Sequence, residues 1–472
     1  MEEVNRSVAC HMTVMAIMSV RILNLVVPLA PPATAMRIRD TTGLPAWSRV
    51  VSLPIGHRLE QSNIDSTTPR STTPTTPGIR ASMMATATST TRTTRSACAR
   101  SADTPAAGHA DFLFEDLVQA YIDCRRSKRN SASALAFEID MGKNLLDLYE
   151  RLKDGSYQPG RHKCFVITRP KPREVWAAPF EDRIVHHLAY NKVSPRFHAS
   201  FITDSCACIP GRGTLYGAQR LEAKIRSITQ NWSRPAWYLK CDLANFFVSI
   251  DKRVVRQILR EKITEPWWRA LVGQILFHDP RQSYDFHGDR RQMALVPPHK
   301  RLLNQPSHKG LPIGNLSSQF FANALLDKLD QRVKHQLKAQ HYIRYVDDFI
   351  LLHESPQQLN AWLDDINQFL PTLGLQLNPK KTILQPIARG VDFVGQVIYP
   401  HRRTIRRRSL RHAIHRIRTG ADDSLFETIN SYYGLLSQAS HSHNDRVRLS
   451  HAVLARGHAV NGELTKTFRR AA

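Results

Sequence analysis

Apolar residues recur at helical spacing from about residue 111 onward. Positions three or four apart predict an amphipathic helix over Phe112–Cys124. Further helices are predicted over Ala134–Lys153, Phe180–Val193, Gly213–Ile228 and Leu316–Leu337. Shorter apolar runs at Cys164–Thr168 and Trp237–Leu243 predict strands. Helices that alternate with strands in this way indicate an α+β core rather than a repeat array.

The first 110 residues have a different composition. Ser66–Arg100 is dominated by Thr, Ser, Pro and Ala, and such a stretch has too few apolar side chains to offset the entropy lost on ordering. We therefore predict a disordered leader over 1–110, an ordered core over 111–400 and a basic, mostly helical segment over 401–472. A transit peptide and an over-extended start codon are the alternatives for the leader.

The charge of the chain narrows the choice of partner. There are 66 lysines and arginines against 40 acids, a net charge of +26, and the pI is near 10.2. This excess indicates a polyanionic partner, nucleic acid first and an anionic membrane second. The leader carries +5, residues 111–400 carry +12 and residues 401–472 carry +9. An apolar content of 42% excludes a collagen and a fully disordered chain.

Cysteine usage and apolar segments bear on the compartment. The seven cysteines are scattered and odd in number, which argues against a disulfide framework. Met12–Val20 and Ile22–Ala30 are each shorter than the ~20 residues of a membrane span. The acidic start also lacks the positive region of a signal peptide. We therefore expect a cytoplasmic protein with no membrane anchor.

Two adjacent acids, Asp347 and Asp348, interrupt an apolar run. Their flanks read as strands, which predicts a β-hairpin with both carboxylates at its tip. Like charges there are costly unless a cation compensates them, and Mg²⁺ prefers oxygen ligands. Asp242 ends an apolar strand and supplies a third carboxylate, and three carboxylates can hold two metal ions roughly 4 Å apart. An isolated Asp-Asp is more often a turn, but the two segments together in a basic chain favour a metal site.

These segments resemble a known family. Tyr345-Val346-Asp347-Asp348 resembles the YxDD signature of reverse transcriptases, and Asp242-Leu243 with the following Phe246-Phe247 resembles their first catalytic palm motif. Residues 310–323, GLPIGNLSSQFFAN, look like the intervening motif. Most reverse transcriptases carry a QG…SP form there, whereas the IGNxxSQ form is similar to that of diversity-generating retroelements and some other bacterial groups.

The resemblance covers roughly residues 111–472 and implies an α+β right-hand polymerase. Fingers and palm would occupy 111–400, and a helical thumb 401–472. The implied activity is RNA-directed DNA polymerase, a nucleotidyltransferase that uses dNTP substrates and two Mg²⁺ ions. Asp242 and Asp347 would bridge the ions, with Asp348 as a supporting ligand.

The implied partners are an RNA template, a DNA or RNA primer and the RNA–DNA duplex between them. For the retroelement type, the resemblance also implies error-prone copying of a template repeat and a small basic helical accessory protein. The protein would then be bacterial or phage-encoded.

Several residues match family positions near the triphosphate. Lys171 and Arg173 alternate with prolines and would grip the phosphates from an exposed fingers strand. Arg183 would contact phosphate or template. Phe247 stands at the family's steric gate against a ribose 2′-hydroxyl, whereas Phe246 is expected in the core because consecutive strand residues face opposite sides. A solvated basic loop is the alternative for Lys171 and Arg173.

Other positions would contact the nascent pair or the leaving group. Gly314 would open space for the template base or the nucleotide, and Ile313 and Gln319 would line the pair and influence fidelity. Helix-start chemistry is the alternative for this motif. Lys381 matches the lysine that can protonate departing pyrophosphate, with Lys380 as runner-up and solvated lysines as the alternative.

Five further positions are expected to contact template or primer. Arg212 lies in a glycine-rich segment that allows close approach to a template strand, although a simple turn fits equally well. Phe393 and Gly395 resemble the primer-grip turn. Arg402 and Arg406 belong to a basic run that opens the thumb, where phosphate contact is expected.

Two other assignments remain open. The protein could be another bacterial reverse transcriptase, of the retron, phage-defence or group II intron-like kind. It could also be a non-catalytic RNA-binding maturase, although the intact Asp242, Asp347 and Asp348 argue against a decayed active site.

Overall fold

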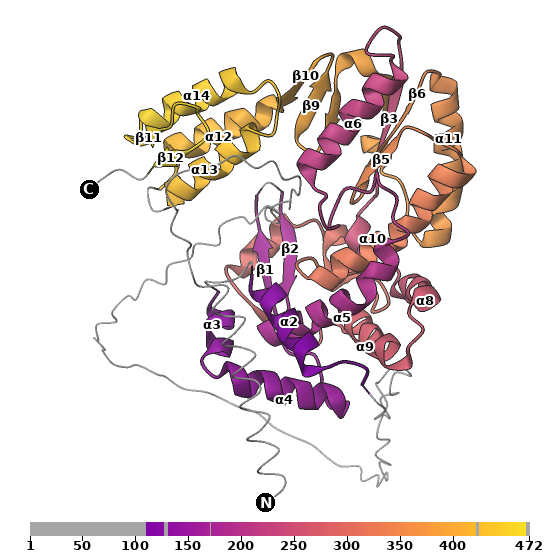
Figure 1. Ribbon diagram of the computed structural model, residues 1–472, viewed down its shortest axis with the longest axis vertical. Helices are drawn as coiled ribbons and strands as arrows, with labels where there is room; N and C mark the ends of the chain where they lie inside the picture. The colour runs from indigo at the N-terminus through magenta and orange to yellow at the C-terminus, as the bar shows by residue number, and fades with distance from the viewer. Residues whose placement is uncertain (1–109, 127–130, 170, 422–423, 469–472) are drawn as a thin grey trace, which may run out of the picture. The chain divides into compact units, whose positions relative to one another are not determined.

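The computed structural model describes residues 110–126, 131–169, 171–421 and 424–468. The predicted leader lies outside these ranges except for Ala110, so that prediction stays a prediction. Helices and sheets are mixed along the described chain, which confirms the predicted α+β class (Figure 1). No helix in the described ranges is long and apolar enough to cross a membrane.

The central sheet has four antiparallel strands in the order β5-β6-β3-β7. Their bounds are β3 Trp237–Asp242, β5 Tyr342–Tyr345, β6 Asp348–His353 and β7 Ile383–Pro386. Strands β5 and β6 form the hairpin that the apolar flanks of the two adjacent acids predicted. The register pairs Asp242 with Asp348, so the ends of two strands from distant parts of the sequence lie side by side.

Both faces of this sheet are covered, which explains why its strands read as continuous apolar runs. Leu239 and Phe349 point into the largest hydrophobic core, whereas Tyr238 and Ile350 point into a second core on the opposite face. The helices that cover the sheet are α10 (Leu316–Gln331) and α11 (Pro356–Phe369) on the first face and α6 (Thr214–Ile228) on the second. Figure 1 shows α6 and α11 on opposite sides of the strands.

Helices also fill the region that surrounds the first face of the sheet. They are α2 (Phe114–Arg125), α3 (Ala132–Glu138), α4 (Met141–Lys153), α5 (Phe180–His198), α8 (Lys252–Lys262) and α9 (Pro266–Phe277). The single helix predicted over Ala134–Lys153 is wrong, because α3 and α4 are separate. Asp140 leaves the helical conformation (φ −131°, ψ 51°), and its carbonyl accepts a hydrogen bond from the Asn144 amide, which starts the second helix.

A second, three-stranded sheet has the order β2-β1-β4. Strand β1 (His162–Ile167) pairs antiparallel with β2 (Arg173–Ala177) and parallel with the short β4 (Tyr284–Phe286). The amide of Trp176 in β2 donates to the Ile313 carbonyl at 2.8 Å. This bond ties the sheet to the loop that precedes α10.

The C-terminal part begins with a third sheet, which three helices and a two-stranded antiparallel sheet follow. Its strands are β8 (Val391–Phe393), β9 (Gln396–Tyr399) and β10 (Arg402–Ile405), and the expected boundary at 400/401 falls in the β9–β10 turn. The elements that follow are α12 (Arg407–Thr419), α13 (Leu425–Leu436), α14 (His443–Leu454), β11 (Ala459–Val460) and β12 (Thr467–Phe468). The three helices enclose a hydrophobic core of their own.

Three histidines meet where β1, α5 and α9 pack together. The rings of His162 and His278 lie 5.0 Å apart, and His186 joins them within the same hollow. Burial, together with the neighbouring imidazoles, lowers the pKa of His162 to about 4 and that of His186 to about 3. These imidazoles are therefore neutral in the folded protein at neutral pH.

Replacing His162 by Gln should make the stability of the protein less sensitive to acid. The folded pKa near 4 lies below the usual 6.5, so stability is lost as the pH falls from 6.5 toward 4. His162 should account for about 2 kcal/mol of the loss between pH 7 and pH 5. Urea unfolding at both pH values measures it. The variant His335→Gln, at an exposed position, should match wild type, and the same loss in His162→Gln would contradict the prediction.

Candidate active site

The three predicted carboxylates meet at one edge of the central sheet. Asp242 is the last residue of β3, Asp348 is the first of β6, and the two are direct cross-strand partners. Asp347 lies in the turn just before β6, and its carbonyl accepts a hydrogen bond from the Leu243 amide at 3.3 Å. The backbone therefore fixes all three carboxylates together.

Burial and neighbouring charges raise the pKa of two of these carboxylates, Asp347 and Asp348. Burial, with the charges of Asp348 and Asp242, raises the pKa of Asp347 to about 6. Burial also raises the pKa of Asp348, which shares a hydrogen bond with Asp242, while Lys240 acts in the opposite direction. The site thus carries more negative charge than its surroundings neutralise.

Lys381 supplies the nearest positive charge. Its Nζ lies 2.5 Å from Oδ2 of Asp242, whose side chain is almost fully buried. Asn378 holds the same aspartate, because its amide donates to the Asp242 carbonyl at 2.8 Å and its Nδ2 lies 3.4 Å from Oδ2. Of the two candidate lysines, the structure brings Lys381 and not Lys380 onto a carboxylate.

The chemistry of these carboxylates fits Mg²⁺, since all the donors are oxygens and the group carries excess negative charge. The described part of the chain nevertheless contains no group of three His, Cys, Asp or Glu side chains already arranged around one metal position. Lys381 neutralises Asp242 instead. Metal binding at Asp242, Asp347 and Asp348 therefore stays a prediction.

Two of the expected nucleotide contacts, Phe247 and Gln319, lie in helices. Phe247 is half-buried and packs edge-to-face on Phe246, and Phe246 is in the core as predicted. The reason given from the sequence is wrong, because Phe246–Ser249 is a short helix, α7, and not a strand. Gln319 is half-buried in the first turn of α10.

Gly314 has a structural role that the sequence did not reveal. Its φ is +125°, and a Cβ at this position would lie 3.0 Å from the Trp176 carbonyl oxygen and 3.1 Å from Cγ1 of Val175. The glycine thus lets the loop before α10 approach strand β2. Ile313 belongs to the same contact, because its carbonyl accepts the Trp176 amide.

The basic candidates near the triphosphate are placed differently from one another. Lys171 and Arg173 are exposed, with Lys171 in the β1–β2 turn and Arg173 at the start of β2. Arg183 lies within α5, and burial lowers its pKa. Its Nε has no partner among the described residues. Lys171 and Arg173 are free to reach an anion from solvent, whereas Arg183 is largely enclosed.

Two of the expected template or primer residues are held by contacts within the protein. Arg212 donates from Nη1 to the carbonyls of Ile202 (2.6 Å) and Ser205 (2.8 Å), so its side chain stabilises this loop, and its contact with a template stays a prediction. Phe393 is fully buried and packs edge-to-face against Tyr345, so its side chain stabilises the YxDD segment through a core contact.

The other three expected contacts lie on or near the surface. Gly395, with φ +89°, follows Val394 in the two-residue turn between β8 and β9. Arg402 is exposed and stacks over the Tyr399 ring, and Arg406 forms an ion pair with Asp392. Their contact with nucleic acid stays a prediction.

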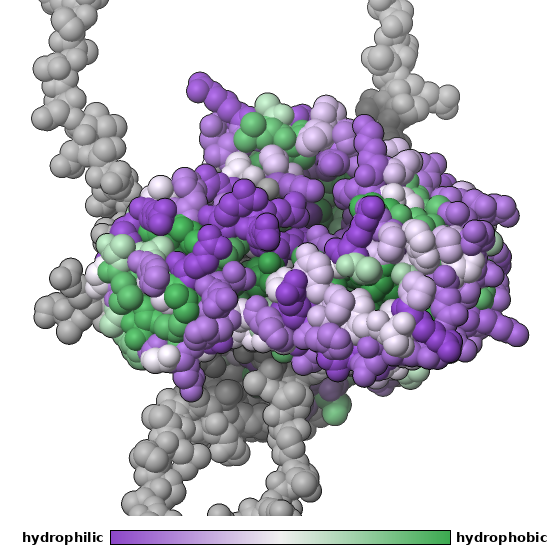
Figure 2. Space-filling view, turned by 90° about the horizontal axis from the view of Figure 1, so that it is seen from above, coloured by the Kyte–Doolittle hydropathy of each residue, from purple (hydrophilic) through white to green (hydrophobic). Residues whose placement is uncertain are grey.

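Helix α12 presents a basic face that the sequence had outlined. Six of its cationic or imidazole side chains are exposed, namely Arg407, Arg408, Arg411, His412, His415 and Arg418. Its apolar side, which includes Leu410 and Ile417, packs into the C-terminal core. Hydrophilic side chains also dominate the molecular face seen in Figure 2.

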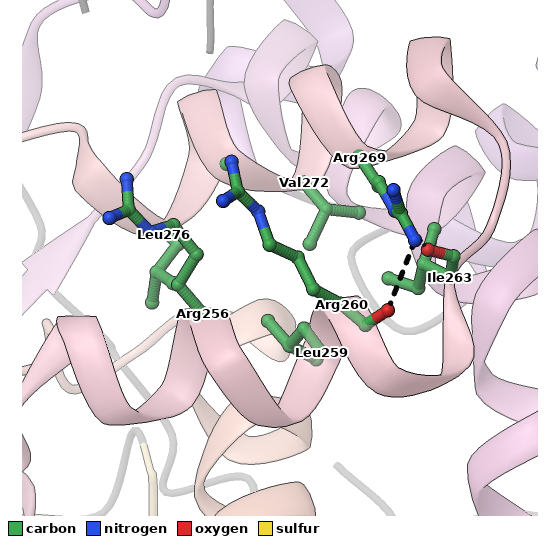
Figure 3. A pocket seen from close by; sticks show the side chains of 8 residues that line it. Arg256, Leu259, Arg260, Ile263, Arg269, Val272 and Leu276 are labelled. Carbon is green, nitrogen blue, oxygen red and sulfur yellow. Dashed lines mark hydrogen bonds between the residues drawn. The ribbon is translucent and has the colours of Figure 1, made fainter. Parts of the chain in front are cut away.

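A separate hollow lies between α8 and α9 (Figure 3). Aliphatic side chains such as Leu259 and Val272 line it together with three arginines. One of these, Arg269, donates to the Arg260 carbonyl at 3.2 Å and to the Ile263 carbonyl, which closes the C-terminal end of α8. No acid lines this hollow, so the carboxylate site remains the candidate for catalysis.

Sequence reasoning missed three residues at the carboxylate site. Asn378 and Lys240 surround Asp242 and Asp348, and Lys240 also donates to the Asp392 carbonyl at 2.9 Å. The position of Lys240 two residues before Asp242, on the same side of a strand, was the available signal. Arg344 lies next to the YxDD segment, and nothing in the local pattern showed that it is fully buried.

Residues 170–398 match the family model of reverse transcriptase (RNA-dependent DNA polymerase). The matched segment holds the three carboxylates, Lys381 and both strands that pair at the site. Residues 170–398 are thus similar to reverse transcriptase domains, whose right-hand polymerase fold agrees with the mixed helices and sheets described above.

Two curated proteins are similar to the chain. Protein YkfC of Escherichia coli (strain K12) is 22% identical over 297 residues, which cover 56% of this chain and 71% of that protein. A Saccharomyces cerevisiae protein named for COX1/OXI3 intron 2 is 21% identical over 218 residues, 34% of this chain and 23% of that protein.

Solved telomerase structures are also similar to the chain. The telomerase of Candida albicans in complex with a TWJ fragment of telomeric RNA has a TM-score of 0.38 at 13% identity, and covers 63% of this chain. The apo telomerase of Candida tropicalis has a TM-score of 0.41 at 13% identity, and also covers 63%. The chain spans 55% and 56% of these two telomerase chains.

Replacing Gly314 by Ala should destabilise the protein by about 1–3 kcal/mol, because a methyl group there strains the positive φ and meets the β2 backbone. Gly142→Ala is the matched control. Gly142 lies in α4 with nothing within 4 Å of a built Cβ, so this change should raise stability by up to about 1 kcal/mol. Urea unfolding measures both variants, and equal stabilities would contradict the prediction.

Proposed function

We propose that this protein is an RNA-directed DNA polymerase that makes cDNA by two-metal nucleotidyl transfer. The observation that carries the proposal is the cross-strand pairing of Asp242 with Asp348, with Asp347 in the adjoining turn. The match of residues 170–398 to the reverse transcriptase model supports it. An RNA template, dNTP substrates and an RNA–DNA duplex follow from the same assignment.

The residues of the site divide the chemical work. Two Mg²⁺ ions held by Asp242 and Asp347, with Asp348 as a supporting ligand, would activate the primer 3′-hydroxyl and neutralise the triphosphate. The Lys381 ammonium, which here contacts Asp242, would give a proton to departing pyrophosphate. The buried carboxylates keep their positions because strands β3 and β6 are hydrogen-bonded along their length.

Nucleic acid would be held by the basic surfaces around this centre. The exposed arginines of α12 suit a phosphate backbone, and each phosphate neutralised should steepen the salt dependence of duplex binding by roughly 0.9 in log–log slope. Lys171 and Arg173 are exposed in the fingers and suit the triphosphate.

The finer assignment is error-prone copying of a template repeat in a diversity-generating retroelement. It rests on the IGNxxSQ form of residues 313–319. With it we propose a cytoplasmic, bacterial or phage-encoded protein that works with a small basic helical accessory protein. A pair of flanking DNA repeats that differ at template adenines would support this subtype.

An intron-type maturase is the second candidate, because one relative is named for an intron. A maturase without catalysis would bind RNA and extend no primer. Primer extension therefore separates the two.

Asp347→Asn should abolish most primer extension on an RNA template while leaving binding of template–primer intact. Loss of one ligand charge removes several kcal/mol of transition-state stabilisation, or about 10³-fold in rate. Single-turnover nucleotide incorporation and fluorescence anisotropy with labelled duplex measure the two properties.

The control is Asp364→Asn, at an exposed position of α11, which should extend primers at the wild-type rate. Wild-type extension by Asp347→Asn would refute the enzymatic assignment. Binding without extension by the wild-type protein itself would favour the maturase.

Ile313→Gln should lower misincorporation opposite template adenines. Ile313 is half-buried at the loop before α10, and a glutamine there restores a hydrogen-bonding side chain beside the nascent pair. Sequencing of cDNA copied from a defined RNA measures the error spectrum. Ile139→Gln, at a side chain 88% exposed on the surface, should leave the spectrum unchanged, and an unchanged spectrum in Ile313→Gln would remove the fidelity role.

A further inference from the structure

Arg344 in strand β5 is fully buried, which is rare for an arginine. Its main partner is Asp330 of α10, which is also fully buried. Nε donates to Oδ1 at 2.8 Å and Nη2 to Oδ2 at 2.7 Å, so the ion pair is bidentate. Although burial opposes its charge, the Asp330 carboxylate keeps the pKa of Arg344 raised. The guanidinium is therefore charged and rigidly held.

The other N–H groups of Arg344 reach three different segments. Nη1 donates to Oδ1 of Asn323 (3.2 Å) and to the Val346 carbonyl (3.1 Å), and Nη2 donates to Oγ of Ser205 (2.8 Å). A guanidinium has five N–H donors, and all five are used here. Arg344 thus connects α10, the loop that contains Ser205 and the turn between β5 and β6.

The loop that contains Ser205 is itself fixed to the strand. The Arg344 amide donates to the Asp204 carbonyl, and the Cys206 amide donates to the Arg344 carbonyl, both at 2.9 Å. Asn323 donates to the Ala207 carbonyl at 2.8 Å. The segments that surround the guanidinium, namely β5, the loop 204–207 and α10, are therefore hydrogen-bonded to one another.

Val346 has an unfavourable backbone. Its φ is +54°, and this left-handed conformation is a genuine outlier for a β-branched residue. Such a conformation persists only where the surrounding structure holds it, and it is concentrated at functional sites. The bond from Arg344 fixes the Val346 carbonyl, which belongs to the same planar peptide group as the Asp347 amide. The orientation of that peptide sets where Asp347 leaves the turn.

We propose that Arg344 is a positioning residue that holds the strained Val346 peptide and so places Asp347 beside Asp242 and Asp348. The inference rests on the proposed function for its catalytic consequence, but the structural coupling between Arg344 and Val346 is independent of it. A purely structural arginine would stabilise the core without any specific link to the turn. The two possibilities differ in how changes at 344 and 346 combine.

The test is a double-mutant cycle with Arg344→Lys and Val346→Gly. Lysine keeps the charge but loses the fork that joins Asp330 to the Val346 carbonyl. Glycine adopts a positive φ without strain, so the turn should depend less on the arginine. We expect Arg344→Lys to slow single-turnover incorporation about 10²-fold at unchanged template–primer affinity, because small misplacements of reacting groups cost this much. Adding Val346→Gly should restore at least about tenfold of that rate.

Tyr342→Phe is the matched control. It removes the hydroxyl that donates to Asp330 at 2.7 Å, in the same network, but has no bond to Val346. It should lower the melting temperature and leave the incorporation rate near that of wild type, with no rescue by Val346→Gly. If Arg344→Lys fails to fold, Ser205→Ala, which removes one acceptor of Nη2, should give a smaller defect that Val346→Gly also rescues.

Mn²⁺ binding, followed by electron paramagnetic resonance, and melting temperatures give readouts that do not need activity. Arg344→Lys should weaken Mn²⁺ binding, and Val346→Gly should recover it. Strictly additive effects of the two changes on rate, Mn²⁺ binding and melting temperature would overturn the positioning role. A wild-type protein that extends no primer would refute the proposed function instead, and coupling in the other two readouts would then still decide the role of Arg344.

Discussion

Negative charge is concentrated where strands β3 and β6 end side by side, and like charges on paired strands destabilise a sheet. Hydrogen bonding along the ladder prevents Asp242 and Asp348 from moving apart, and Asp347 follows from the adjoining turn. Burial, together with this repulsion, therefore raises the pKa values of Asp347 and Asp348 in the folded protein. Positive charge is needed at this end of the strands, and Lys381 and Lys240 supply part of it from the chain itself.

The surrounding fold resists this repulsion by rigidity. Both faces of the central sheet are buried, so its strands cannot tilt to separate the carboxylates. Arg344, which Asp330 holds in an ion pair, donates a hydrogen bond to the Val346 carbonyl and so fixes the peptide that precedes Asp347. A buried ion pair is weak support for stability in general, because desolvation offsets its attraction, and its retention is better explained by the geometry that it imposes.

Local patterns were sufficient to predict that the carboxylates meet. Apolar flanks around Asp347 and Asp348 marked a hairpin tip, and Asp242 ended another apolar strand, so both signals came from a few neighbouring residues. The rest depended on contacts between distant segments. Phe393 looked like a primer contact until its burial under Tyr345 was seen, and the close approach that requires Gly314 comes from β2, far away in the sequence. The partners of Arg212 are carbonyl groups, which no side-chain pattern can reveal.

The net charge of +26 must be considered together with the acidic cluster of Asp242, Asp347 and Asp348. A protein that only held RNA would need the exposed arginines of α12, and three carboxylates kept in repulsion would weaken that binding. Repulsion between fixed carboxylates costs folding free energy, so its retention indicates a functional role for these side chains. Under the proposed function, a positive exterior would attract the phosphate backbone, and the fixed acidic centre would bind cations where that backbone is extended. A positive exterior and an acidic centre in one protein therefore fit the proposed polymerase better than they fit RNA binding alone.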